Sequence, residues 1–317
     1  MCANAGVYVR NRTDARAIAR YHAGMIRLQF TIELKYDIAD QPSDFVFNIH
    51  AAQTPSQVIV AEQLRTSQQV PTAMYTDPML GSRFMRLTAN PGQLSVQYDA
   101  TVDINHHFEA PMNIGEVPIA RMPPDVLPFI YPSRYCQSDR LRKLATREFG
   151  HLQLGYWRVQ AIADWVKQRT AFTMGASNSS TAAVDTLVEQ VGVCRDFAHL
   201  MIALCRALNI PARFVTGIDY GAAPELGPTD FHAYVEVFLG HRWYLFDPSG
   251  ISPPMGLVRL GTGRDAADVS FATMFGAVKS YAPVMSIHAV NDPANGFTLP
   301  YHSTDAISTH GELVMSQ

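Results

Sequence analysis

The chain changes its hydrophobic periodicity once, and the change falls at a segment rich in proline. Short alternating runs such as RLQFTIELKY, FVFNIHAA and QLSVQYDATVDI fill the region from Ile26 to about Val117. Alternation in short segments separated by turn signals is typical of a β-sandwich. The next stretch, VPIARMPPDVLPFIYPSRYC, holds five prolines. It cannot continue a sheet, because proline has no amide hydrogen to donate to a neighbouring strand.

A helical period begins after this segment. SDRLRKLATREFG opens with two N-cap candidates, Ser138 and Asp139, and WRVQAIADWVKQRTAF places Val159, Ile162 and Val166 on one helix face. A chain of 317 residues exceeds the length at which a single core usually stops growing, so two domains are expected. We predict an α+β protein in five parts, namely a flexible extension at residues 1–24, a β-sandwich domain at 25–118, a linker at 119–137, a core at 138–290 and a tail at 291–317.

The charge pattern argues against several classes of partner. The formal net charge is −3 and no basic run is present, so neither nucleic acid nor a membrane is an expected partner. No apolar run is long enough to span a bilayer. The first 24 residues lack the apolar core of a secretory signal, which favours a cytoplasmic location. Met25 stands at the head of the first alternating run, so the first 24 residues are expected to be either a flexible extension or the result of a misplaced translation start.

The cysteines give no sign of a metal site. Cys2, Cys136, Cys194 and Cys205 form no CxxC pair, and no HExxH motif is present. We therefore expect no metal and no cofactor. In a reducing cytoplasm all four thiols are expected to be free.

Two of these cysteines lie on one predicted helix, in GVCRDFAHLMIALCRALNIPAR. Cys194 and Cys205 are eleven residues apart, which puts them on nearly the same face but about 16 Å apart along the axis. Cys194 follows Gly192 and sits in the first turn, where free amide groups and the positive end of the helix dipole lower a thiol pKa. Cys205 lies among apolar residues and is expected to be buried and inert. Cys194 is therefore the candidate nucleophile.

Two neighbours on this helix are not expected to assist Cys194. His199 lies about 140° around the helix from Cys194, so it faces away. Asp196 lies about 200° away, and a supporting role at the helix N-terminus suits it better. The general base must come from another part of the chain.

A predicted hairpin supplies a histidine and an aspartate. DFHAYVEVFLGHRWYLFDPSG reads as two alternating strands, and a two-residue turn at Leu239 and Gly240 would place His232 directly opposite Asp247. A four-residue loop would shift the pairing by two but keep both residues on one face, whereas an odd-length loop would separate them. Such a pair suits a carboxylate that holds an imidazole, which then takes the proton of the thiol.

Together, GVCRDFAHLMIALCRALNIPARFVTG and DFHAYVEVFLGHRWYLFDPSG resemble the transglutaminase-like superfamily, in its bacterial branch with an N-terminal β domain. YPSRYCQSD and GRDAADVSF are similar to that branch too. The resemblance implies a papain-like α+β core whose catalytic residues fall on Cys194, His232 and Asp247. It also implies attack of the thiolate on an amide carbonyl and a thioester intermediate. Calcium activation is not implied, because no EF-hand-like acidic loop is present.

The expected function is a cysteine protease or amidase, or an acyltransferase that acts on protein glutamine, with a protein or peptide substrate. An acetyltransferase of the arylamine type uses the same three residues, but no feature for an acetyl-CoA site is present and the β domain precedes the core. A non-catalytic scaffold is the third reading. It usually shows as loss of one of the three residues, and all are present. Neither the substrate nor the oligomeric state follows from these patterns.

Overall fold

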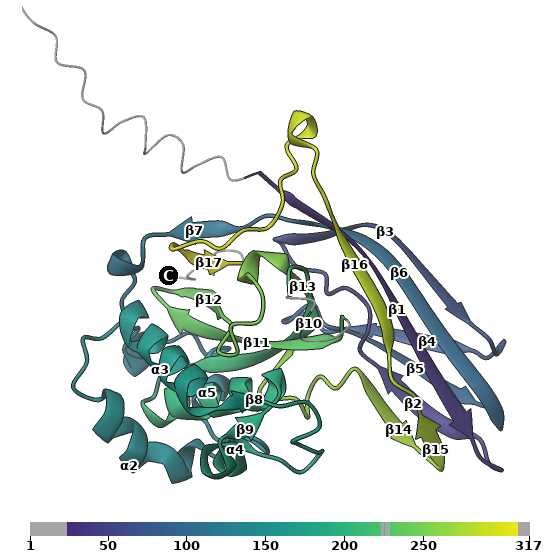
Figure 1. Ribbon diagram of the computed structural model, residues 1–317, viewed down its shortest axis with the longest axis horizontal. Coiled ribbons are helices and arrows are strands. Elements are labelled where there is room, and N and C mark those ends of the chain that lie inside the picture. Colours follow the sequence, from purple (N-terminus) through teal and green to yellow (C-terminus); the bar gives the residue numbers. More distant parts are fainter. Residues whose placement is uncertain (1–23, 223–224, 226–228, 310–317) are drawn as a thin grey trace, which may run out of the picture.

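The computed structural model describes residues 24–222, 225 and 229–309. Apart from Gly24, the extension predicted at residues 1–24 lies outside this part of the chain. The described residues form an α+β fold, as predicted, in which a β-sandwich lies on one side and four helices gather on the other (Figure 1).

The N-terminal domain is built from two antiparallel sheets. One has the order β15-β1-β6-β3 with β16 also paired to β1, and the other has the order β14-β2-β5-β4. Buried residues alternate along β1 and β6, and they share one apolar core with Phe45 and Phe47 of the second sheet. Its first six strands are β1 (Ile26–Ile38), β2 (Ser43–Phe47), β3 (Gln57–Thr66), β4 (Thr72–Thr76), β5 (Arg83–Ala89) and β6 (Gly92–Ile104). The next strand, β7 (His107–Glu109), belongs to a separate two-stranded sheet.

The proline-rich segment forms no sheet. It contains two short 3-10 turns, η2 (Ile119–Arg121) and η3 (Leu127–Ile130), and a third, η1 (Pro111–Asn113), lies just before it. Both η1 and η3 have proline in one of their first two positions. Proline suits the start of a helical turn, because the amide there has no partner inside the turn. Val126 and Phe129 from this segment pack with Phe238 and Trp243 of the second domain.

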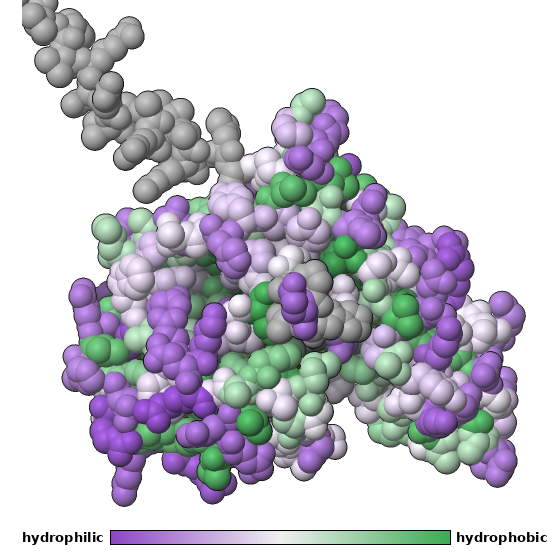
Figure 2. Space-filling model, in the orientation of Figure 1, coloured by the Kyte–Doolittle hydropathy of each residue, from purple (hydrophilic) through white to green (hydrophobic). Residues whose placement is uncertain are grey.

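The second domain places four helices around a central sheet. On α2 (Ser138–Phe149), Leu141, Ala145 and Phe149 are buried at intervals of four residues, while hydrophilic side chains gather over α2 and α3 on the outside (Figure 2). The sheet has the antiparallel order β12-β11-β10-β13. The other elements are α3 (Tyr156–Arg169), β8 (Ala171–Phe172), α4 (Ala183–Glu189), β9 (Val191–Gly192), α5 (Cys194–Ala207), β10 (Ala212–Asp219), β11 (Phe231–Leu239), β12 (Arg242–Phe246), η5 (Pro254–Gly256) and β13 (Leu257–Gly263).

Helix α5 lies at the centre of this domain. Every residue from Asp196 to Ala207 is buried, and the helix packs against α2, α3, α4 and the strands β10 and β11. A helix that is apolar on most sides needs such a surrounding, because each exposed apolar face would cost free energy in water. The first residue of α5 is Cys194, so the predicted helix start is correct.

The C-terminal part of the chain returns to the N-terminal domain. We predicted a core that runs to residue 290, but β14 (Ala272–Phe275) pairs with β2, while β15 (Val278–Ser280) and β16 (Val284–Val290) pair with β1. In the predicted tail, η6 (Pro293–Asn295) is followed by β17 (Ala306–Ser308), which pairs with β7. The alternation in these segments indicates strands but does not say which sheet they join. Both sheets of the sandwich therefore contain strands from the two ends of the chain.

In the part of the chain that the structure describes, we find no helix with the length and apolar character needed to cross a membrane.

Candidate active site

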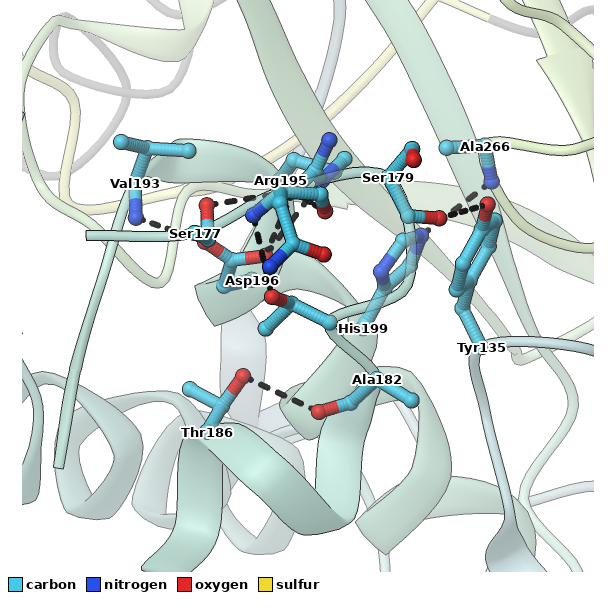
Figure 3. Close-up of polar contacts among 12 residues, drawn as sticks. Tyr135, Ser177, Ser179, Ala182, Thr186, Val193, Arg195, Asp196, His199 and Ala266 are labelled. Atoms are coloured by element: carbon cyan, nitrogen blue, oxygen red, sulfur yellow. Dashed lines mark hydrogen bonds and ion pairs between the residues drawn. The ribbon is translucent and has the colours of Figure 1, made fainter. Parts of the chain in front are cut away.

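The start of α5 is held by a buried aspartate. Asp196 is fully buried, and its Oδ2 accepts a hydrogen bond of 2.9 Å from the backbone N–H of Val193, the residue before the helix. Its Oδ1 accepts from Arg195 Nε at 3.3 Å. Figure 3 shows these contacts around the first turn. Asp196 therefore supports the helix N-terminus, as predicted, and fixes the backbone at Cys194.

His199 faces another part of the structure. It is fully buried, and its Nε2 accepts a hydrogen bond of 3.2 Å from the backbone N–H of Ala266 (Figure 3). Its ring stacks on Tyr135, whose own N–H donates to Asp265 Oδ2 at 2.9 Å. Burial lowers the pKa of His199 well below its usual value. This histidine joins the segments around residues 135 and 265 to α5, and it remains uncharged.

The hairpin of β11 and β12 brings His232 and Asp247 together with a register different from the predicted one. The turn lies at Gly240 and His241, because Leu239 pairs with Arg242. Both turn residues have positive φ, at 53° and 65°, as the favoured two-residue hairpin turns require. The predicted turn began one residue earlier, so the observed pairing is shifted by two positions. A shift of two keeps side chains on the same face, and that prediction is confirmed.

The imidazole of His232 lies between a carboxylate and the thiol. Its Nε2 is 3.4 Å from Asp247 Oδ2, and the side chain of Cys194 interacts with the same imidazole. Burial alone would lower the pKa of His232. The charges of Asp247 and Cys194 and hydrogen bonds to both outweigh that effect and raise the pKa well above its usual value. The arrangement therefore favours an imidazolium beside the sulfur.

Asp247 is itself held in place by the chain that follows it. Its Oδ1 accepts from the N–H of Ser249 at 3.0 Å, and its Oδ2 accepts from the N–H of Ile251 at 3.0 Å. Burial would raise the pKa of Asp247, but the charge of His232 and hydrogen bonds from the side chains of His232 and Ser249 and from the backbone of Ser252 lower it overall. The side chain is a carboxylate in a fixed orientation, and the Asp-Pro-Ser-Gly sequence that forms its turn is visible in the chain.

A pocket of about 840 Å³ opens over these residues. Cys194 and His232 line it, together with residues from the strands that rejoin the β-sandwich, Ala272 and Ile287. Phe231 and Phe271 stack at 4.3 Å between ring centres and form part of its wall. The pocket therefore draws on both domains, and its size suits a short peptide segment.

The other described cysteines lie away from solvent. Cys136 and Cys205 have no exposed surface, whereas Cys194 is partly exposed. Burial raises the pKa of Cys136 to about 12 and that of Cys205 further still. Neither can present a thiolate at neutral pH. Cys2 lies outside the described residues.

Comparison with known proteins identifies the family. Residues 143–248 match the transglutaminase-like superfamily, and residues 26–125 match the N-terminal domain of bacterial transglutaminases. The crystal structure of a proposed cysteine protease from Cytophaga hutchinsonii is 38% identical, with a TM-score of 0.82, over 90% of this chain and 98% of that one. The chain belongs to the transglutaminase-like superfamily.

Two further relatives of this transglutaminase-like protein match only part of the chain. An uncharacterized protein of Mycobacterium leprae is 30% identical over 117 residues, which is 35% of this chain and 42% of that protein. The uncharacterized protein YebA of Bacillus subtilis is 26% identical over 164 residues, which is 44% of this chain and 22% of that protein. The chain thus spans less than half the length of these curated relatives.

One residue of the transglutaminase-like site was not predicted. Asp219 ends β10, is 6% exposed, and places its Oδ2 3.9 Å from Nδ1 of His232. The pairing of β10 with β13 is interrupted by a bulge between Thr216 and Gly217, and a bulge re-aims the side chains that follow it. Strict alternation along β10 does not place Asp219 in the pocket. In the sequence, the sign of a bulge was Gly217, because glycine inside a strand often marks one.

Proposed function

We propose that this protein is a cysteine enzyme that cleaves or transfers an amide acyl group through a thioester on Cys194. The observation that carries the proposal is the position of His232, which is held between the sulfur of Cys194 and the carboxylate of Asp247. Cys194 and His232 line the pocket to which both domains contribute, and Asp247 contacts the imidazole of His232. The relationship to a proposed cysteine protease over nearly its whole length supports the same conclusion.

The mechanism follows from the order of these groups. The proton of Cys194 passes to the imidazole of His232, and the thiolate attacks the amide carbonyl carbon. The carbonyl electron pair moves to the oxygen, where the backbone N–H of Cys194, unpaired at the helix start, is the first donor. When the C–N bond breaks, the imidazolium gives its proton to the leaving nitrogen. Ammonia or an amine departs and the acyl group remains on sulfur as a thioester.

The second half of the reaction restores the thiol. Water or a second amine attacks the thioester carbonyl, and His232 accepts the proton of this nucleophile. As the C–S bond breaks, the imidazolium returns that proton to Cys194. Asp247 stabilises the imidazolium in both halves and keeps the ring in one orientation. Water gives hydrolysis and an amine gives transfer, so the two outcomes share one intermediate.

The proposal includes a protein or peptide substrate, because the pocket of about 840 Å³ has the size of a short segment of chain. Aromatic side chains form part of its wall, which suits contact with apolar parts of a peptide. The cytoplasmic location stays a prediction made from the sequence.

Alkylation tests the nucleophile without knowledge of the substrate. At pH ~6, iodoacetamide is expected to label Cys194 much faster than Cys136 or Cys205, because the thiolate is the reactive form. The labelled residue is identified by mass spectrometry of peptides. His232→Ala should remove the advantage, and His151→Ala, which changes an exposed histidine, should leave it intact. Equally slow labelling of all thiols in the folded protein would contradict an activated Cys194.

Turnover decides between hydrolysis and transfer. The protein is incubated with a casein-like glutamine donor, with and without a labelled primary amine, and both released ammonia and incorporated label are measured. Incorporation identifies transfer, whereas ammonia or peptide cleavage without incorporation identifies hydrolysis. Cys194→Ala should abolish both. Signals that persist in Cys194→Ala would show that the reaction does not use this thiol.

A further inference from the structure

A second carboxylate lies in the pocket without a hydrogen-bond donor of its own. Asp219 is 6% exposed, and within the described residues its Oδ2 has no hydrogen-bond partner. The 3.9 Å from this oxygen to Nδ1 of His232 is an ion-pair distance but is too long for a hydrogen bond. By contrast, both oxygens of Asp247 accept hydrogen bonds from the backbone. A buried carboxylate without such donors is costly unless a cation or donor reaches it.

A third carboxylate lies next to it. Asp230 immediately precedes β11, whose residue Phe231 pairs with Ile218, the neighbour of Asp219. Asp219 and Asp230 both line the pocket. Asp230 is exposed at the pocket edge, and its Oδ1 accepts a hydrogen bond of 2.7 Å from the backbone N–H of Phe231. Partial desolvation and the charge of Asp219 nevertheless raise the pKa of Asp230. The two carboxylates therefore act on each other, and a bound cation would relieve their repulsion.

The cations of the site are already matched by other anions. Among the described residues that line the pocket, Arg195 and His232 are the basic side chains. The guanidinium of Arg195 bonds to Asp196 and to the carbonyl oxygen of Asn178 at 2.8 Å. The imidazolium of His232 is matched by Asp247 and the sulfur. Asp219 and Asp230 leave this side of the pocket with excess negative charge.

The wall beside the two carboxylates is apolar. Phe231 directly follows Asp230, and its ring stacks on Phe271 in the segment before β14. Ala272 and Ile287, from the strands that rejoin the β-sandwich, continue this wall. Carboxylates next to an aromatic pair suit a cation on an aliphatic stem, because the stem packs on the rings while the charge meets the oxygens.

We propose that Asp219 and Asp230 form a binding site for an alkylammonium group of the substrate, in contact with the Phe231–Phe271 wall. This inference rests on the proposed function, because it names the chemistry of the substrate that enters the same pocket. The ammonium group has two possible sources. It belongs either to the molecule that carries the amide carbonyl, as a lysine side chain near the cleaved bond would, or to the amine that resolves the thioester.

Thiol reagents of different charge test the site without turnover. The rate of modification of Cys194 is measured with three methanethiosulfonates, carrying trimethylammonioethyl, sulfonatoethyl and methyl groups, at constant ionic strength. Pockets lined by one sign of charge speed the entry of the opposite sign by roughly 10- to 1000-fold. The cationic reagent should therefore react at least ~10 times faster than the anionic one, after correction for their intrinsic reactivities.

Variants identify the source of this selectivity. Asp219→Asn should reduce the preference for the cationic reagent about tenfold and leave the neutral reagent within about twofold. Asp44→Asn removes an exposed carboxylate of the β-sandwich and should change neither rate. An unchanged preference in Asp219→Asn would overturn the proposal. An equal loss with all three reagents would overturn it too, since it would assign Asp219 to the positioning of His232.

Protection of the wild-type protein gives a result that does not depend on the folding of a variant. n-Butylammonium should slow the reaction of Cys194 with the neutral reagent in a saturable manner, whereas n-butanol at the same concentration should not. Equal protection by both compounds, or by neither, would show that the pocket does not select the charge.

Turnover then separates the two sources. The KM values of two glutamine peptides, one with lysine and one with norleucine beside the glutamine, show whether the ammonium group belongs to the acyl substrate. The KM values of 1,5-diaminopentane and pentylamine show whether it belongs to the acceptor amine. Asp219→Asn should raise KM only for the lysine peptide or only for the diamine. If it raises neither, the site does not serve the substrate. Charge-selective labelling without any amide turnover would contradict the proposed function and support the cation site. Amide turnover without charge-selective labelling would support the proposed function and contradict the cation site.

Discussion

Nε2 of His232 lies 3.4 Å from Oδ2 of Asp247, although the two residues are not direct partners across the hairpin. Val235 pairs with Phe246, so the same register places Asp247 next to Tyr234. The carboxylate thus approaches the imidazole diagonally, and its own turn, through Ser249 and Ile251, orients it. The geometry of this pair depends on the turn after β12 as much as on the sheet.

Asp247→Asn is expected to abolish most activity without unfolding the protein. An amide in this position can stabilise the wrong tautomer of the imidazole, and the same change in a serine protease triad lowers kcat about 10⁴-fold. We expect a fall of roughly 10³- to 10⁴-fold here, together with slower alkylation of Cys194 at pH ~6. Steady-state kinetics and labelling measure both effects. Asp164→Asn changes an exposed carboxylate on α3 and should retain wild-type rates, and similar losses in both variants would assign the effect to stability.

The pKa of His232 is expected to fall when Cys194 is replaced by alanine. The sulfur raises this pKa by its charge and its hydrogen bond, and burial acts against it. NMR titration of the histidine Cε1–H signals measures the shift. His50, whose pKa burial lowers to about 4, should stay neutral through the same range and serves as an internal control. An unchanged titration of His232 in Cys194→Ala would show that the two groups are not coupled.

The same shift sets the direction of a pH effect on stability. The pKa of His232 is higher in the folded protein than the ordinary value of 6.5. Protonation of His232 therefore stabilises the fold fully below pH 6.5, and this contribution is lost as the pH rises through the higher folded-state pKa. The contribution of Asp247 to stability depends on pH in the opposite direction, because the pKa of this carboxyl is lowered from 3.8 in the folded protein. Its contribution is present above pH 3.8 and is lost as the pH falls through the folded-state value.

Local rules were sufficient to predict much of the geometry of the candidate site. The choice of Cys194 over Cys205 followed from position along one helix, since only the first turn has free amide groups. The shared face of His232 and Asp247 needed only an even-length turn, so an error in the turn position did no harm. Both inferences depend on the regular geometry of a single helix or hairpin, which is the same in every protein.

Longer-range features of the fold did not follow from the sequence. The strands at 272–290 alternate like any half-buried strand, and nothing in their pattern says that they pair with β1 and β2 instead of the second domain. Asp219 was missed because a bulge breaks the alternation of β10 before it. In both cases the outcome depends on partners more than 35 residues away along the chain, such as Leu257, which pairs with Asp219.

Glu236→Ala is expected to destabilise the sheet that carries His232. Glu236 is fully buried, and it accepts from Arg213 Nε at 2.7 Å and from Arg259 Nη1 at 3.0 Å. Its loss leaves two buried guanidinium groups without this carboxylate, which typically costs about 3–5 kcal/mol. Thermal or urea unfolding measures the change.

An exposed ion pair provides the control for this change. Asp268→Ala breaks the pair of Arg264 and Asp268 at 3.0 Å, where the side chains are 53% and 32% exposed. Pairs of this kind contribute about 0–1 kcal/mol. If Glu236→Ala costs no more than Asp268→Ala, the buried cluster does not stabilise the sheet.

Asp196→Ala is expected to lower both stability and the reactivity of Cys194. The Asp196 carboxylate accepts the N–H of Val193 at 2.9 Å and so fixes the first turn of α5, and loss of such a cap costs about 0.5–2 kcal/mol. Asp185 makes the matching contact at α4, where its Oδ2 accepts the N–H of Ala182 at 2.9 Å. Asp185→Ala should therefore cost similar stability and leave the iodoacetamide rate of Cys194 unchanged. Both variants lose a helix cap, but only the cap made by Asp196 lies at the helix that begins with Cys194. A slower iodoacetamide reaction in Asp196→Ala alone would therefore show that this contact positions the thiol. Equal rates in the two variants would mean that the thiol does not depend on this contact.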